Sequence, residues 1–336
     1  MNSSRITGYA ALERGGQLMP YSYEPPALKD HEVRIAITHC GICATDIQAI
    51  DDFYDITDYP FVPGHEIVGA IVETGKDVPS SRLGERVGIG WQGRTCGHCE
   101  WCKQDLVTLC QEVVDNAVWK PFGGFSSSIV ADNNFVYPIP DGMPSEIGAV
   151  LMCAGITVFA PLHHHLAPHQ QRIGVMGIGG LGHLAIQFAN KMGYEVTAIS
   201  TSPGKREEAL ALGAHKFLVI SDKEDEKKYG YYFDLLLCTA HGRVDWERAL
   251  EILKKRGKVI LTGFPEMHFR PIDLVAHELS ISGSFLGQPA EMLEMLRFSQ
   301  DNDIRPRVEL LSMAEVNQAI QRVRENKARY RVVLCN

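Results

Sequence analysis

Four closely spaced cysteines form the pattern in this chain that most directly suggests chemistry. Cys96, Cys99, Cys102 and Cys110 are separated by two, two and seven residues. Four thiolates at such spacing can enclose Zn²⁺ in a closed tetrahedron, which is typical of a structural site. Disulfides are the alternative. The chain has nine cysteines and no apolar leader at its start, so we expect a reducing compartment, the cytoplasm, and a bound metal.

A second group of soft metal ligands is spread over three separate segments. Cys40 and Cys43 lie close together, His65 is followed by the carboxylate Glu66, and Cys153 comes much later in the chain. Two thiolates and one imidazole bind Zn²⁺ with one position left open, as a catalytic zinc requires. The sequence therefore predicts two Zn²⁺ per chain, one structural and one catalytic.

A glycine-rich segment follows a predicted strand and opens a predicted helix. In that context the pattern G-x-G-x-x-G binds the pyrophosphate of a dinucleotide at the helix N-terminus. Glycines that serve only close packing are the alternative. The residues of the segment are Gly177, Ile178, Gly179, Gly180, Leu181 and Gly182.

The end of the next predicted strand indicates which dinucleotide is bound. An NAD site usually has a carboxylate there, but residues 200–206 contain none and instead include Ser200, Thr201, Ser202 and Lys205. Hydroxyls and cations suit a 2′-phosphate, so NADP(H) is expected rather than NAD(H). Ser202 as a simple helix cap is the alternative, and the two roles are compatible.

The elements that must position these residues differ between the two parts of the chain. The first ~150 residues are rich in Gly and Pro and contain short β-type runs at 33–37 and 67–72, which indicates a strand-rich domain. From there, strands alternate with helices, which predicts a parallel sheet. Expected strands are 172–176, 196–200, 217–220, 233–238 and 258–261, and expected helices are 181–192, 203–213 and 246–255. A helix after 287, a strand at 307–310, a helix at 314–324 and a strand at 330–334 are expected to return to the first domain.

Composition excludes several classes of protein. A chain of 336 residues, 45% of them hydrophobic, can form two domains with sizeable cores. The net charge of −8 argues against nucleic-acid and anionic-membrane surfaces, including a zinc-ribbon nucleic-acid binder. Two basic runs, 254–256 and 322–331, are expected on helices as solvated faces. No long apolar run of the ~20 residues that span a bilayer is expected, and so no membrane contact is expected.

Taken together, these segments make the chain resemble the zinc-dependent medium-chain alcohol dehydrogenases. Within that superfamily it resembles the cinnamyl alcohol dehydrogenase-like group. The resemblance covers essentially the whole chain and rests on segments 43–46, 64–66, 96–110, 151–157, 177–183 and 200–205. It implies an α/β fold with a Rossmann doubly wound parallel sheet domain over 153–286. A β-rich GroES-like catalytic domain would cover 1–152 and 287–336, with its zinc lobe near 91–112. It also implies a homodimer or higher homo-oligomer, paired near residues 281–285.

The resemblance also implies roles at the catalytic metal. The implied ligands are Cys43, His65 and Cys153. Glu66 would occupy the fourth position when substrate is absent, and Asp46 would support the imidazole. Cys40 would then be a small buried residue. A redox pair of Cys40 with Cys43 is the alternative, and it would destroy the zinc site.

The same resemblance implies how protons and the cofactor are handled. Thr45 would pass the proton between the substrate oxygen and the cofactor ribose. Many relatives continue this relay through a histidine three residues later, where this chain has Gln48, so the relay is expected to use water. Residues implied at the nicotinamide half of the cofactor are Thr45, Thr157, Thr239, Gly263, Ser284, Phe285 and Leu286.

The function implied is hydride transfer between NADP(H) and an aromatic or medium-chain primary alcohol or aldehyde. Phe53, Trp91 and Leu286 are candidate walls of the substrate pocket, although each could equally pack in a core. A polyol or secondary-alcohol dehydrogenase of the same superfamily is the nearest alternative. A non-catalytic nucleotide-binding member is another, which the complete ligand set argues against.

Overall fold

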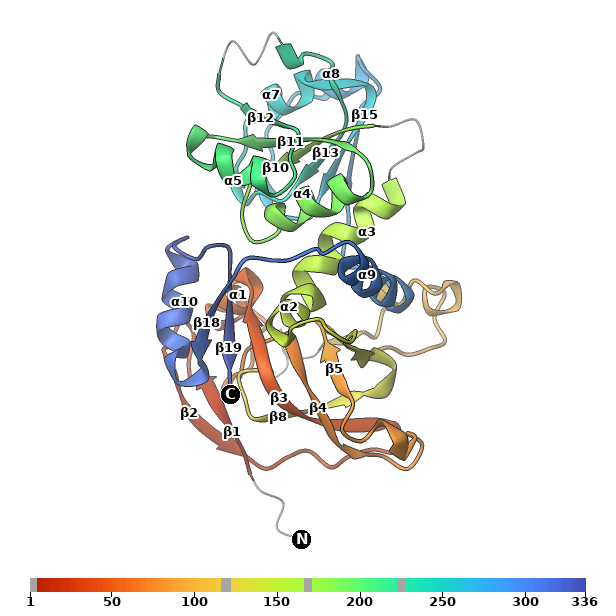
Figure 1. Ribbon diagram of the computed structural model, residues 1–336, viewed down its shortest axis with the longest axis vertical. Coiled ribbons are helices and arrows are strands. Elements are labelled where there is room, and N and C mark those ends of the chain that lie inside the picture. Colours follow the sequence, from red (N-terminus) through yellow and green to blue (C-terminus); the bar gives the residue numbers. More distant parts are fainter. Residues whose placement is uncertain (1–4, 116–121, 166–170, 223–227) are drawn as a thin grey trace. The chain divides into compact units, whose positions relative to one another are not determined.

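The computed structural model describes residues 5–115, 122–165, 171–222 and 228–336. The chain divides into two compact units, coloured mainly red to yellow and blue for the first and green to cyan for the second (Figure 1). The first unit comprises Met1–Cys153, Gln288–Asp301 and Arg305–Asn336. The second comprises Ala154–Gly287 and Asn302–Ile304.

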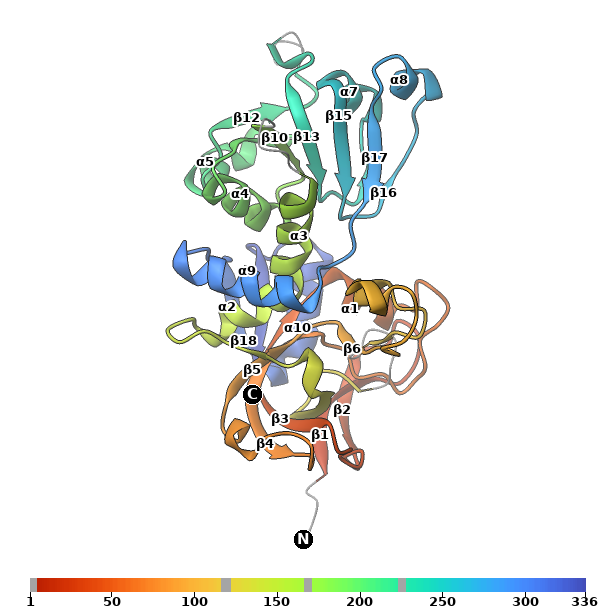
Figure 2. The same ribbon diagram turned by 90° about the vertical axis from the view of Figure 1, so that its right-hand side faces the viewer.

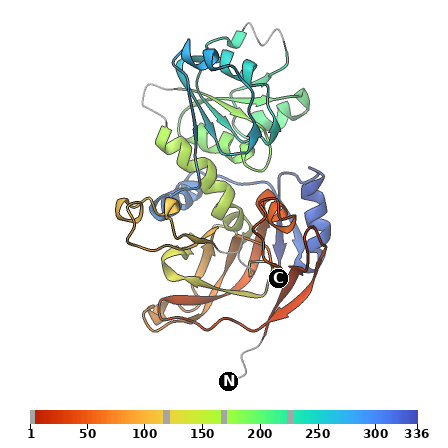
Figure 3. The ribbon, with the colours of Figure 1, turned by 180° about the vertical axis from the view of Figure 1, so that it is seen from behind.

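The first unit is built on a sheet of seven strands, in the order β18-β19-β3-β4-β5-β9, with β8 also paired to β3. The C-terminal strand β19 lies directly beside β3, so segments from the first and last parts of the chain share one sheet (Figure 3). Its strands are β3 (Glu32–Ile42), β4 (Glu66–Thr74), β5 (Arg86–Ile89), β8 (Ser128–Asp132), β9 (Tyr137–Pro138), β18 (Val308–Ser312) and β19 (Arg331–Cys335). Two small sheets accompany it, formed by β1 (Ile6–Ala11) with β2 (Leu18–Tyr23) and by β6 (Gln92–Arg94) with β7 (Val114–Asp115).

Helices of the first unit are α1 (Ala44–Ile50), α2 (Ser145–Val150), α9 (Pro289–Asp301) and α10 (Val316–Arg324). Apolar side chains that alternate along β3, such as Val33, Ile35 and Ile37, are buried in the core of this unit. The helix α10 packs its buried residues Val316, Ala319 and Ile320 into the same core.

The second unit contains a six-stranded parallel sheet in the order β12-β11-β10-β13-β15-β17. This order reverses direction between β10 and β13, as in a doubly wound dinucleotide fold. Its strands are β10 (Arg172–Met176), β11 (Glu195–Ser200), β12 (Lys216–Val219), β13 (Phe233–Cys238), β15 (Leu253–Leu261) and β17 (Ser280–Gly283). Figure 2 shows β13, β15 and β17 side by side, with β17 at the edge.

Helices of the second unit are α3 (Ile156–His165), α4 (Gly182–Lys191), α5 (Arg206–Ala211), α7 (Trp246–Glu251) and α8 (Pro271–Val275). A pair of two-residue strands, β14 (Gly242–Arg243) and β16 (Pro265–Glu266), completes it. The expected α/β class, with a strand-rich first part and an alternating second part, is confirmed.

Two sequence expectations about the basic runs are wrong. The helix expected over 246–255 ends at Glu251, and residues 254–256 belong to β15, where Lys254 pairs with Asp234 at 2.6 Å. In the second run, Arg331 is buried rather than solvated, and it begins the strand β19.

One helical stretch is longer and more apolar than the sequence analysis expected. The helical residues Ser145–His165 span 21 residues with a mean hydropathy of 1.7, which by length and composition could cross a membrane. However, 89% of the most apolar window is buried inside the protein. A core helix passes the same test, and burial of this kind is what a core helix requires.

Candidate functional site

Four potential ligands meet at the junctions of the first unit. Cys43 lies between the end of β3 and the start of α1, His65 directly precedes β4, and Glu66 is the first residue of β4. Cys153 lies in a π-helical turn, Leu151–Gly155, a rare geometry that often marks functional sites. The ligand atoms of all four side chains lie within 4.8 Å of one another.

Asp46 organises this cluster from the first turn of α1. Its Oδ1 accepts hydrogen bonds from His65 Nδ1 at 2.8 Å and from the backbone N–H of Gly64 at 3.0 Å. Its Oδ2 accepts from the backbone N–H of Cys43 at 2.8 Å. Nδ1 donates its proton to the Asp46 carboxylate, so Nε2 is the nitrogen of His65 that can bind a metal, as in most histidines that ligate one.

The pKa shifts of the cluster show which of its groups would release a proton to a bound cation. Hydrogen bonding from the neighbouring Cys153 thiol holds the pKa of Cys43 well below its usual range, while the same contact raises the pKa of Cys153. Burial opposes protonation of His65, but the Asp46 carboxylate outweighs it and raises the pKa of His65. Two sulfurs and an imidazole nitrogen are ligands that Zn²⁺ prefers, so the residues fit this metal.

Glu66 is fully buried and forms an ion pair with Arg331, which the sequence did not predict. Burial raises the pKa of Glu66 to about 7, against the lowering effect of Arg331. Nη2 of Arg331 donates to Oε1 of Glu66, and both side chains are buried. Oε2 of Glu66 has no hydrogen-bond partner, and one oxygen of this carboxylate lies within 4.8 Å of the other ligand atoms. The only signal in the sequence was a carboxylate at the start of an apolar strand, which must find a cation when buried.

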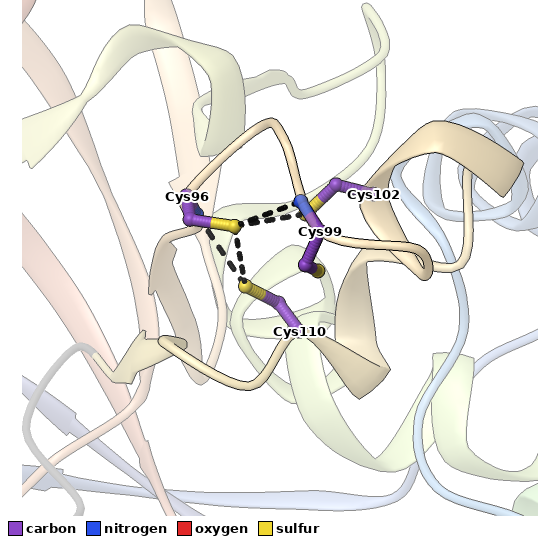
Figure 4. A group of neighbouring side chains, drawn as sticks. All are labelled: Cys96, Cys99, Cys102 and Cys110. Carbon is purple, nitrogen blue, oxygen red and sulfur yellow. Dashed lines mark hydrogen bonds between the residues drawn. The ribbon is translucent and has the colours of Figure 1, made fainter.

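The four cysteines of the predicted structural site also converge (Figure 4). Their sulfurs lie within 4.8 Å of one another, with 3.6 Å between Cys110 and Cys96 and 3.9 Å between Cys96 and Cys102. These distances are far longer than a disulfide bond, and all four residues are free thiols. The alternative of a disulfide framework therefore does not hold.

Backbone N–H groups donate hydrogen bonds to these sulfurs, as they do to the negatively charged thiolates that bind a metal. The N–H of Cys99 donates to Cys96 Sγ at 3.3 Å, and the N–H groups of Cys96 and Glu112 donate to Cys110 Sγ at 3.4 Å. Hydrogen bonding from the backbone of Cys102 lowers the pKa of Cys99 to about 6. Such a set fits a closed Zn²⁺ site with no position for substrate.

In the second unit, the glycine-rich turn joins β10 to α4. Gly177 has a φ of +87°, and a Cβ on Gly182 would lie 1.8 Å from the carbonyl oxygen of Gly177. Only glycine fits at both positions, which leaves the start of α4 open to a pyrophosphate. The turn therefore has the geometry that its sequence predicted.

The residues expected at the 2′-phosphate lie after β11. Thr201 and Ser202 are exposed, and Ser200 accepts a hydrogen bond from the N–H of Ser202 at 3.3 Å. Nζ of Lys205 donates to the carbonyl oxygen of Ile178 at 2.6 Å, which ties this segment to the glycine-rich turn. The next cation, Arg206, instead lies over the ring of Phe217 at 4.8 Å.

Thr239 has a supporting role that the sequence did not suggest. Its buried hydroxyl donates to the carbonyl oxygens of Gly177 at 2.8 Å and Met176 at 3.1 Å. It therefore braces the glycine-rich turn from the end of β13. Of the other residues expected at the nicotinamide, Thr157 lies on α3, Gly263 follows β15, and Ser284, Phe285 and Leu286 follow β17.

The residues predicted for the proton relay and for the substrate pocket are divided between the two units. Thr45 is in the first turn of α1, with Oγ1 3.6 Å from Cys43 Sγ. Phe53 is 66% exposed in the loop after α1, and Trp91 is partly buried before the cysteine lobe, while Leu286 belongs to the second unit. Cys40 is fully buried, and burial raises the pKa of its thiol well above the usual range, as expected for a packing residue.

Comparisons with known proteins agree with this geometry. Residues 29–141 match the model of the alcohol dehydrogenase GroES-like domain, and residues 180–301 match that of the zinc-binding dehydrogenases. An 8-hydroxygeraniol dehydrogenase from Catharanthus roseus is 39% identical over 97% of this chain and 94% of its own length. A cinnamyl alcohol dehydrogenase structure from Sorghum bicolor superposes with a TM-score of 0.93 and 34% identity, covering 99% of this chain and 98% of that one.

The chain belongs to the zinc-dependent medium-chain alcohol dehydrogenases, in the cinnamyl alcohol dehydrogenase-like group. It also superposes on a cinnamyl alcohol dehydrogenase from Helicobacter pylori, solved in complex with NADP(H), with a TM-score of 0.90 and 30% identity over 98% of both chains. An alcohol dehydrogenase of this group is an oxidoreductase of small alcohols or aldehydes. The expected GroES-like and Rossmann architecture is thereby confirmed.

Proposed function

We propose that this protein is an NADP(H)-dependent zinc alcohol dehydrogenase that works mainly as a reductase of aromatic or medium-chain aldehydes. The observation that carries the proposal is the convergence of Cys43, His65 and Cys153, with His65 oriented by Asp46. Retention of this complete set argues against a non-catalytic member of the family. Relatives named for cinnamyl alcohol and for 8-hydroxygeraniol support a primary alcohol or its aldehyde as substrate.

The protein's own residues would hold the reactants and move the proton. Bound Zn²⁺ supplies polarisation of the substrate oxygen, and reduced nicotinamide supplies hydride. Asp46 keeps the His65 ring fixed, so the open side of the ligand set stays aligned with the substrate oxygen. We assign to the Thr45 hydroxyl the transfer of a proton to that oxygen. Gln48 cannot titrate near neutral pH, so we assign the next step of the relay to water.

A second Zn²⁺ in the cysteine lobe completes the proposed metal content. The support for it is the set of four free thiols whose sulfurs already accept backbone hydrogen bonds. Thiolates that ligate zinc need a reducing environment, and we therefore propose a cytoplasmic location.

NADP(H) is proposed over NAD(H) on the chemistry after β11. The exposed hydroxyls of Thr201 and Ser202 and the ammonium of Lys205 can all bind a phosphate, and residues 200–206 offer no carboxylate to a ribose 2′-hydroxyl. The NADP(H) complex of the Helicobacter pylori relative supports the same choice.

The test measures oxidation of NADPH and of NADH by absorbance, with benzaldehyde, cinnamaldehyde, hexanal and an aldose. We expect turnover of the first three aldehydes with NADPH and much slower turnover with NADH. Ser200→Asp should reverse the preference, because it offers a carboxylate to the ribose and repels the phosphate. A preference for the aldose would contradict the proposed substrate class, and silence with every pair in zinc-loaded protein would contradict the proposed function.

We also propose a homodimer formed through the second unit. Among the described strands of its sheet, β17 is at the edge and pairs only with β15. The helix α8, which leads into β17, exposes Ile272 and Val275, at 57% and 72%. An edge strand beside exposed apolar side chains is a template for pairing with a second copy.

A further inference from the structure

A further group of potential metal ligands adjoins the four cysteines of the lobe. The Sγ of Cys96, a ring nitrogen of His98 and a carboxylate oxygen of Glu112 lie within 4.8 Å of one another. Cys96 belongs to both groups, and it takes part in every hydrogen bond drawn among the four cysteines in Figure 4. The four-cysteine site therefore has a second set of ligands, of different chemistry, that shares one of its own sulfurs.

The ring of His98 is held in one orientation. Its Nδ1 lies 2.9 Å from the carbonyl oxygen of Cys96, which can only accept a hydrogen bond, so we assign a proton to Nδ1. The other ring nitrogen, Nε2, then faces Oε1 of Glu112 at 3.7 Å. Zn²⁺ binds nitrogen and carboxylate oxygen at about 2.0–2.2 Å, which at a tetrahedral angle places the two atoms about 3.4 Å apart. The spacing of His98 and Glu112 is thus close to the one that a shared ion requires.

An ion pair between a protonated His98 and Glu112 is the alternative. Both side chains are largely exposed, at 74% and 69%, and an exposed pair of this kind contributes little to stability. Such a pair also makes no use of the sulfur of Cys96, which lies beside both groups. Zn²⁺ binds sulfur, nitrogen and oxygen ligands alike, so one ion can contact all three residues.

Exposure to solvent differs between this group and the sulfurs of the lobe. Cys102 and Cys110 are only 8% and 4% exposed, and Cys96 is partly buried. His98 and Glu112 are the exposed members of the cluster. An ion that arrives from solvent therefore meets these two side chains before it reaches the buried sulfurs.

A closed four-coordinate site has no vacant position through which a metal ion can enter or leave. Its ligands must therefore be exchanged one at a time, and a neighbouring ligand that holds the ion partway lowers the barrier in both directions. Cys96 suits the step between the two sets because its sulfur belongs to both. Four thiolates are softer ligands than an imidazole and a carboxylate, so the four-cysteine set is the final position for Zn²⁺.

We propose that His98 and Glu112 form an entry site that receives Zn²⁺ from solvent and passes it through Cys96 to the four-cysteine site. This inference rests on the structural Zn²⁺ proposed above. The side chains of the entry site and then the sulfurs replace the water ligands of the ion, and the thiols that bind it release their protons to solvent. The charge of the ion does not change, so the transfer needs no oxidant or reductant. Release follows the same path in reverse.

The experiment follows zinc in the cysteine lobe alone. Trypsin cleaves after Arg94 and Lys103, and the peptide between them contains three of the four lobe cysteines and none of the proposed catalytic ligands. Alkylation of this peptide, measured by mass spectrometry, reports how many lobe thiols are unprotected. Release is timed after a chelator is added to zinc-loaded protein, and entry is timed after excess Zn²⁺ is returned to the same sample.

The variants are His98→Ala and Glu112→Gln. We expect release and entry to slow together, each about tenfold, which corresponds to about 1.4 kcal/mol in the barrier. The zinc content at equilibrium should not change, because an entry site alters the path and not the final state. The double variant should be little slower than either single variant, since the two side chains hold the ion as a unit.

Two controls match the substituted residues. Glu100→Gln changes an exposed carboxylate of the same lobe that belongs to none of the ligand groups found among the described residues. His31→Ala removes an exposed histidine that lies beside Asp132 elsewhere in the first unit. Both controls should release and take up zinc at the rates of the unaltered protein.

The direction of the change separates an entry site from simple support of the fold. Faster release or a lower zinc content in His98→Ala and Glu112→Gln would show that these residues only stabilise the lobe, and would overturn the inference. Unchanged rates would overturn it as well, while leaving the structural zinc site intact. If zinc never protected the lobe thiols of the unaltered protein, the structural site itself would fail, and the inference with it.

Discussion

At the scale of single residues, Asp46 is the group on which the candidate catalytic site depends. It accepts three hydrogen bonds, from His65, Gly64 and Cys43. Asp46→Asn replaces one acceptor by an N–H donor that faces another donor, so the His65 ring loses its orientation. We expect zinc affinity at this site to fall about 10–100-fold, the usual effect of losing such a support.

Competition with a chromophoric chelator measures this change. The zinc ion proposed in the cysteine lobe would provide an internal reference, since the hydrogen bonds that Asp46 forms go to His65, Gly64 and Cys43 and not to that lobe. Asp77→Asn, an exposed position elsewhere in the unit, is the matched control. Equal zinc retention in Asp46→Asn and the unaltered protein would show that the hydrogen bonds to Asp46 do not orient a ligand.

Arg331 is expected to matter for stability as well as for the site. In Arg331→Leu, Glu66 would be left buried beside two thiols without its cation, which typically costs about 3–5 kcal/mol. Urea unfolding of the metal-free protein measures the loss. Adding Glu66→Gln should recover much of it, because the uncompensated charge is then removed. Arg5→Leu, which breaks an exposed pair with Glu24, should cost at most about 1 kcal/mol. Similar costs for the two arginines would contradict this account.

Single residues were predictable from the sequence where their chemistry depends on type and spacing. The cysteine lobe, His65 and the glycine-rich turn have such patterns, and the structure brings the members of each together. Arg331 was not predictable, because it follows a run of surface cations and its partner lies 265 positions away. Thr239 was expected at the cofactor, but its contact with the carbonyl of Gly177 depends on strand order, which its own sequence does not encode.

At the scale of elements, the cysteine lobe is tied to the rest of the first unit by a few side-chain contacts, such as those between Thr108 and Gln288. It has little regular structure besides short 3₁₀ turns and β6 paired with β7. Cys96→Ser should therefore reduce zinc from about two to about one per chain, because a four-thiolate site rarely survives loss of a ligand. Amide exchange at His98 and Cys99, which donate to Cys96 Sγ, should become faster.

The control for the lobe is Cys335→Ser, since Cys335 ends β19 outside both ligand clusters. It should keep the zinc content of the unaltered protein. If Cys96→Ser kept all its zinc, the lobe would not be a zinc site. If it lost both ions, the two sites would be coupled, and the assignment of an independent structural site would be wrong.

Helices and strands with a clear pattern of apolar residues were predictable from the sequence. Segments whose residues favour one element locally but pair in another were not. The strands at 172–176 and 233–238 have the expected limits, because each is a short apolar run between turns. The segment 246–255 looked helical throughout, since Lys254 and Lys255 favour helices. In the structure the helix stops at Glu251, because residues from Leu253 onward complete β15 alongside β13, and tertiary pairing overrides local preference.

At the scale of the whole molecule, the proposed homodimer can be tested at β17 and α8 of the second unit. Ile281 is only partly buried at the edge strand, and Val275 is largely exposed. If a second copy pairs here, charged side chains should prevent it, as lysines do on natural edge strands. The double variant Val275→Lys with Ile281→Lys is therefore expected to be a monomer, while the unaltered protein sediments as a dimer or larger.

Sedimentation velocity over a range of protein concentrations distinguishes the outcomes. The control is Leu310→Lys, which places one lysine on β18, an edge strand of the sheet in the first unit, where Leu310 is 53% exposed. Dissociation by Leu310→Lys and not by the double variant would move the interface to the first unit. A monomeric unaltered protein would contradict the dimer itself. Circular dichroism of each variant shows whether the sheets are intact, so loss of pairing can be separated from loss of fold.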